Sequence, residues 1–197
     1  MTLRLARALA LLLWVAIAGL AALPGAARAA EAIEVQSARL EPSAEGWLLS
    51  ADLALALPPR LDDAVNRGVV LSFLVEFELI RPRWYWFDES VAAASQTYRL
   101  SYHALTREYR LARAGLGQTF QSLAEALAAM SRVRGWRVLE PDQVRPGNDY
   151  EVRVRMRLDT TQLPKPFQVN ALTNRDWTPG SEWKRFRFSP ETPKSAP

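Results

Sequence analysis

The chain of 197 residues contains no cysteine and only one histidine, His103. The lack of cysteine excludes disulfide bonds, thiolate zinc sites, cysteine nucleophiles and a lipid-modified N-terminal cysteine. A single histidine excludes metal sites built from several imidazoles. The sequence also has no phosphate-binding loop, no dinucleotide fingerprint and no dense Asp/Asn loop for calcium. We therefore expect neither a metal ion nor a cofactor.

The chain also has little net charge outside its N-terminal residues. Residues 1–29 hold three of the 25 basic residues and none of the 21 acidic ones, so the formal net charge of +4 falls to about +1 for the remainder. A nearly neutral domain has no electrostatic footprint for DNA or RNA, and we expect no nucleic-acid partner. Hydrophobic residues make up 49% of the chain, which is typical of a globular protein.

The one long apolar run lies at the N-terminus. Arg4 and Arg7 precede an uncharged apolar stretch, residues 8–23, and Ala27-Arg28-Ala29 has the small-x-small pattern that signal peptidase cleaves. This order predicts a signal peptide over residues 1–29 and a periplasmic location for the rest. The alternative is an uncleaved anchor, which would then be the only part of the chain in contact with a membrane.

Alternating polar and apolar residues dominate the remainder and predict β-strands. The clearest segments are residues 47–57, 69–80, 96–104 and 150–158, among seven to nine such segments. Because alternation indicates antiparallel strands with one wet face, we predict a single-domain antiparallel β-sandwich, loosely immunoglobulin-like, over residues 30–188. A disordered, proline-rich tail is expected over residues 189–197. The alternative is an α+β fold with one curved sheet packed on a helix.

One segment has helical periodicity instead. The positions of its expected inner face lie three or four residues apart: Phe120, Leu123, Leu127, Met130 and Arg134. The spacing predicts an amphipathic helix from about Thr119 to Arg134, which Gly135 ends. By contrast, residues 163–167 contain two prolines and are expected to be extended.

Three motifs stand in a familiar order: residues 81–86 (RPRWYW), 99–107 (RLSYHALTR) and 163–172 (LPKPFQVNAL). Together they resemble an uncharacterised family of exported proteobacterial proteins, catalogued as domain of unknown function 4390. The resemblance runs from about Val35 to Phe188. It implies an exported envelope protein with no assigned activity and no catalytic residues to carry over. The family's gene neighbourhoods contain a membrane sensor kinase, which implies a membrane sensor protein as a partner.

A ladder of arginines is the first candidate binding feature. Arg153, Arg155 and Arg157 project from one face of the strand 150–158 at intervals of about 6.7 Å, and each guanidinium can hold a carboxylate or phosphate. These residues are candidates for an anionic envelope ligand or an acidic partner. The alternative, which the near-neutral charge favours, is structural pairing with an acid on a neighbouring strand. The acids considered for this pairing are Glu76, Glu78 and Glu108.

The aromatic run 81–87 is the second candidate, with Arg81, Arg83, Trp84 and Trp86 as its predicted contact residues. In an extended chain, successive side chains face opposite ways. One side would then expose large aromatic residues beside arginines, a combination that is typical of binding surfaces. The alternative is that one side fills the core while the other stacks with arginines.

Signals for catalysis are weaker. His103 and Ser101 lie two residues apart on one predicted strand, too far for a direct bond, and no nucleophile elbow surrounds Ser101. Nothing suggests a cleft between the paired carboxylates Glu76 and Glu78. We therefore predict a non-enzymatic binding or adaptor domain of the cell envelope, which serves a membrane sensor or an envelope assembly, with His103 as a further binding candidate. The alternative is a periplasmic hydrolase that uses His103 or paired carboxylates.

Overall fold

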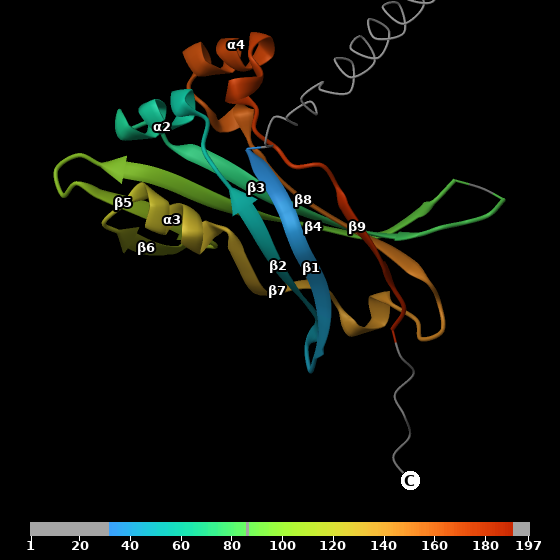
Figure 1. The fold of residues 1–197 in the computed structure, drawn as a ribbon. Coiled ribbons are helices and arrows are strands. Elements are labelled where there is room, and N and C mark those ends of the chain that lie inside the picture. Colours follow the sequence, from blue (N-terminus) through green and yellow to red (C-terminus); the bar gives the residue numbers. More distant parts are fainter. Residues whose placement is uncertain (1–31, 86, 191–197) are drawn as a thin grey trace, which may run out of the picture. The chain divides into compact units, whose positions relative to one another are not determined.

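The strands form two sheets in which every pair of neighbours is antiparallel (Figure 1). The computed structural model describes residues 32–85 and 87–190, which contain nine strands. The first sheet has the order β1-β2-β7, formed by Ile33–Ser43, Gly46–Leu55 and Arg132–Leu139. The second has the order β6-β5-β4-β3-β8-β9, formed by Leu116–Phe120, Glu108–Arg113, Glu89–His103, Leu71–Arg81, Tyr150–Leu158 and Lys184–Phe188. The predicted mainly β, sandwich-like fold is confirmed, and the chain does not adopt the alternative with a single sheet.

Two predicted segments fall outside the described residues: the signal peptide expected over residues 1–29, and residues 191–197 of the expected tail. The chain divides into two compact units, Met1–Ala30 and Glu31–Pro197. Within the described residues, a hydrophobic core is formed by positions 33–188, so the second unit carries a core of its own and can be studied as a domain. No helix within the described ranges is long and apolar enough to cross a membrane.

The core lies between the inner faces of the two sheets. On β3 and β8 the inward side chains are buried almost completely: Phe73, Val75, Phe77, Val152, Val154 and Met156. Strand β1 of the first sheet packs against β8 and β9 of the second. The alternation predicted for β3 and β8 is confirmed, since their polar residues face the opposite side of the sheet.

The amphipathic helix is shorter than its periodicity predicts. Helix α3 spans Leu123–Met130 and not Thr119 to Arg134. Ser122 caps its start by accepting a hydrogen bond from the backbone N–H of Glu125, which is the Ser-x-x-Glu signal of a helix N-terminus. After the helix the chain enters β7, because pairing with β2 outweighs local helix propensity there.

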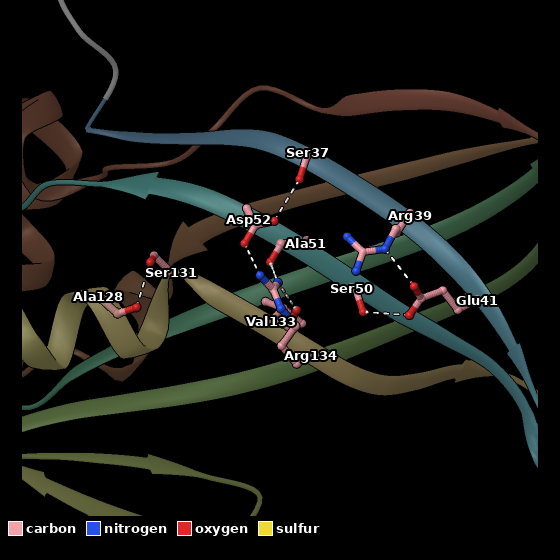
Figure 2. A network of polar contacts seen from close by, with 10 residues as sticks. All are labelled: Ser37, Arg39, Glu41, Ser50, Ala51, Asp52, Ala128, Ser131, Val133 and Arg134. Atoms are coloured by element: carbon pink, nitrogen blue, oxygen red, sulfur yellow. Dashed lines mark hydrogen bonds and ion pairs between the residues drawn. The ribbon is translucent and has the colours of Figure 1, made fainter.

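Arg134 and Gly135 therefore serve a strand and not a helix end. Gly135 has a φ of +58° and lies where the register between β2 and β7 shifts, as in a β-bulge. The Arg134 guanidinium donates to the carbonyl oxygens of Ala51 at 2.8 Å and Val133 at 2.9 Å, and it pairs with Asp52 (Figure 2). These bonds fasten β7 to β2.

A helix also replaces the extended segment expected over residues 163–167. Helix α4 spans Lys165–Thr173, with Pro164 at its N-cap and Pro166 in its first turn. Proline is tolerated there because the first turn of a helix needs no backbone N–H donor, so the two prolines start this helix. Helix α2, Pro59–Asn66, lies at the same end of the domain as α4 (Figure 1), and the turn Arg175–Trp177 contacts both.

Candidate functional site

The hairpin of β3 and β4 projects beyond the neighbouring strands of its sheet (Figure 1). Strand β8 pairs with β3 only as far as Ile80, and β5 pairs with β4 only from Tyr98 onward. The pairing of β3 with β4 continues to Arg81 opposite Glu89. The loop 82–88 therefore begins at the end of the hairpin, two residues beyond the last β3 residue that pairs with β8.

Aromatic side chains crowd this tip. Trp84 is 94% exposed, Tyr85 68% and Phe87 83%. The rings of Trp84 and Tyr85 touch edge to face, with their centroids 5.1 Å apart. These three residues lie in the loop after β3 and none of them enters the core, which differs from the interpretation that one side of the run is buried. Trp86 lies outside the described residues.

Two arginines behind the tip share one carboxylate. Glu89 accepts hydrogen bonds from Arg81 and from Arg83, the second at 2.5 Å. The bond from Arg81, then that from Arg83, lowers the pKa of Glu89, so the group is ionised at neutral pH. Two guanidinium groups therefore converge on one carboxylate directly behind the aromatic residues, and with Asp88 the segment 81–89 holds two arginines and two acids. Local patterns in the sequence do not bring Glu89 to these arginines, because its register opposite Arg81 depends on the length of the loop.

A small polar pocket of about 220 Å³ adjoins the base of the hairpin. Its lining includes Arg81 and Arg145 but also Glu89 and Asp142. The two positive and two negative side chains balance, so this pocket has no preference for an anion.

The arginine ladder lies on the outer face of the six-stranded sheet and is engaged with acids. Glu76 on β3 accepts from Arg155 at 2.5 Å and from Arg157 at 3.0 Å. Burial of Glu76, with 19% of its side chain exposed, disfavours its charged form, but the bonds from Arg157 and Arg155 outweigh burial and lower its pKa. The Arg155 guanidinium also stacks on Trp183, 4.3 Å from the ring centroid.

Arg153, the third residue of the ladder, pairs with Glu151 at 2.5 Å and lies 3.7 Å from Asp88. Glu78 is opposite Arg153 in the register, whereas Glu108 is on β5, away from the ladder. The ladder is thus bound to acids, although Glu76 is the only one of the three expected acids that takes part in these ion pairs. The geometry favours a structural role for it.

His103 lies at the exposed end of β4, opposite Glu108 on β5. Its carbonyl oxygen accepts a hydrogen bond from the backbone N–H of Arg107 in the turn between these strands. Ser101 lies opposite Arg110. The hydrolase alternative stays a prediction. Within the described ranges, no group of three or more histidine, aspartate or glutamate residues could hold a metal ion.

The structure also contains an apolar groove that sequence reasoning missed. It has a volume of about 570 Å³ and lies between the end of β2, α2 and α3. Leu53 and Leu55 line one side, and Leu123 and Leu127 line the other. No local signal could have revealed it, since it depends on where the shortened helix packs.

The fold and the hairpin together define a mainly β, sandwich-like domain with a projecting, aromatic-tipped arm. By sequence, the chain belongs to the family described as Domain of unknown function (DUF4390), whose match covers residues 30–187. The resemblance drawn from the three motifs is thereby confirmed over nearly the whole predicted domain. No curated protein and no solved structure matches the chain.

Proposed function

We propose that the chain is an exported, non-catalytic binding domain of the cell envelope and that the tip of the β3–β4 hairpin is its recognition element. The observation that carries this proposal is the exposure of Trp84, Tyr85 and Phe87 on a projecting arm. Contiguous apolar surface on a soluble domain marks interaction sites. Trp, Tyr and Arg are also the residues most enriched where binding energy concentrates.

The tip is separate from the elements that hold the fold together. None of the loop residues that the structure describes, 82–85, 87 and 88, takes part in the hydrophobic core. The arm is stiffened at its base by the ion pairs of Glu89 with Arg81 and Arg83. A rigid arm that carries exposed aromatic residues loses little conformational entropy on binding, which favours recognition by the tip.

The state of the carboxylates supports a non-catalytic role. Glu76 and Glu89 are both held by arginines that lower their pKa values. A general acid needs the opposite shift, because it must stay protonated near neutral pH. Both groups are better suited to fixing strands and arginines than to transferring protons.

Export is supported by the order of basic, apolar and small residues in positions 1–29. The partner that the family resemblance implies is a membrane sensor protein, which makes the domain an adaptor. An envelope assembly and an anionic envelope ligand are further partners consistent with an arm that carries aromatic and basic residues.

The test compares retention of the domain, residues 30–197, on an envelope fraction. The double variant Trp84→Ala/Tyr85→Ala should bind at least about tenfold more weakly, because two large apolar contacts are lost. Leu105→Ser is the matched control, since Leu105 is an exposed apolar residue in the turn between β4 and β5. Equal retention of the double variant and the wild type would remove the hairpin tip as the recognition element.

A further inference from the structure

We infer that the partner of the hairpin tip is the surface of a phospholipid bilayer, into whose interfacial layer Trp84 and Tyr85 insert. This inference rests on the proposed function and names the partner of the same site. It departs from the sequence-based expectation that only an uncleaved N-terminal segment would touch a membrane.

The first argument is the distribution of the aromatic surface around the tip. Trp84 and Tyr85 are adjacent in sequence, yet both are largely exposed, and Phe87 adds further apolar surface. A groove on a protein covers one side of an inserted strand or turn. The rings of Trp84 and Tyr85, in contact with each other and exposed at the end of a loop, instead suit a medium that can enclose the whole tip, as the bilayer interface does.

The second argument is the chemistry of the tip. Residues 84–87 are four consecutive aromatic residues with no charge among them. Trp and Tyr are the side chains that concentrate at membrane interfaces, where the ring meets acyl chains and the N–H or O–H group meets headgroups. The loop that carries them lies at the end of the β3–β4 hairpin, which extends beyond the neighbouring strands (Figure 1).

The third argument is the charge directly behind the aromatic residues. Arg83 precedes Trp84, and the guanidinium groups of Arg81 and Arg83 converge on Glu89, so both lie at one level. With the rings inserted, that level corresponds to the phosphate groups, which arginine binds through paired hydrogen bonds. Asp88, the only acid in the loop, lies 3.7 Å from Arg153, which also pairs with Glu151, so the arginines that face the headgroups are Arg81 and Arg83.

The inference is tested with protein-free vesicles in which phosphatidylethanolamine exceeds phosphatidylglycerol, and with the domain of residues 30–197. Co-flotation of the wild-type domain with vesicles is expected. Trp84→Ala/Tyr85→Ala should lower the partition coefficient at least about tenfold, whereas Leu105→Ser should not change it. Thermal melting of all three proteins shows whether the variants keep the fold.

The lack of cysteine in the chain allows a second, positional test. In Tyr85→Cys, a thiol-attached, environment-sensitive fluorophore should shift its emission to the blue when these vesicles are added. The same label in Leu105→Cys should show no shift, because that turn lies at the other end of β4. A shift at both positions would contradict insertion of the tip.

The two proposals fail in different ways. If retention on envelope fractions depends on Trp84 and Tyr85 but the vesicles bind no domain, the bilayer inference is overturned and the tip binds an envelope protein. If vesicle binding is the same for the wild type and the double variant, the inference is overturned as well. If neither vesicles nor envelope fractions respond to the tip, both proposals fall.

Discussion

At each of two places in the six-stranded sheet, a single glutamate binds two arginines. In the middle of β3, Glu76 binds Arg155 and Arg157 of the neighbouring strand β8. At the start of β4, Glu89 binds Arg81 and Arg83, which flank the end of β3. The two clusters contain the same charged residues, one glutamate and two arginines, but their surroundings differ.

The surroundings decide what each cluster does. Glu76 has a paired strand on either side, and Trp183 covers one of its arginines, so its ion pairs tie strands together. Glu89 stands at the base of a loop in which Trp84 and Tyr85 are exposed. Two arginines on one glutamate cross-link strands within the sheet, and at the tip the same arrangement places two arginines beside an exposed aromatic surface.

The largest expected contrast lies between two aromatic residues of the same hairpin. Phe77 is fully buried at the centre of β3. Its replacement by alanine should lower the free energy of unfolding of the domain by about 3–5 kcal/mol, because a cavity remains. Trp84→Ala should leave the free energy of unfolding unchanged, since Trp84 is not part of the core. Urea unfolding of the domain measures both. A large loss in Trp84→Ala would mean that the tip supports the fold, against the contrast drawn here.

The next effect concerns the cluster in the middle of the sheet. Glu76→Gln should lower the free energy of unfolding by about 1–2 kcal/mol, because two partly buried guanidinium groups lose their charged acceptor. Glu78→Gln is the control, since Glu78 lies two residues along the same face and has no ion pair among those found in the described ranges. An equal loss in both variants would show that the ion pairs of Glu76 are not the cause.

The dependence of stability on pH sharpens the same contrast. The folded-state pKa of Glu76 lies below its unfolded value, so its contribution is fully present above the unfolded pKa of about 4.3 and is lost as the pH falls through the folded pKa. Between about pH 5 and pH 3, the wild type should therefore lose more stability than Glu76→Gln. Urea midpoints measured across this range provide the test. Parallel curves for the two proteins would contradict the assignment.

Local patterns in the sequence are enough to predict the strands but not the clusters. The alternation in β3 and β8 identifies both faces of each strand, since the burial of a strand residue follows its period of two. The bond between Arg155 and Glu76 joins residues 79 positions apart, and only the register of β3 with β8 brings them together. The exposure of the tip likewise depends on where pairing ends. Helix α3 shows the same distinction. Its start is predictable from the local Ser-x-x-Glu signal, whereas its end is set by the pairing of β7 with β2.

The smallest expected change in stability, and the sharpest test of the hairpin cluster, comes from Glu89→Gln. Because this ion pair is solvent-accessible, the melting temperature should stay close to that of the wild type. Removal of the carboxylate frees Arg81 and Arg83 for phosphate groups, so the affinity for vesicles that contain phosphatidylglycerol should rise about fivefold. Added salt should reduce this gain, whereas vesicles of phosphatidylcholine alone should show less of it. Glu76→Gln should leave vesicle affinity unchanged, since its arginines lie on the body of the sheet. If Glu89→Gln binds anionic vesicles no better than the wild type, the arginines of the hairpin do not face phosphate, and the two clusters are alike in function as well as in composition.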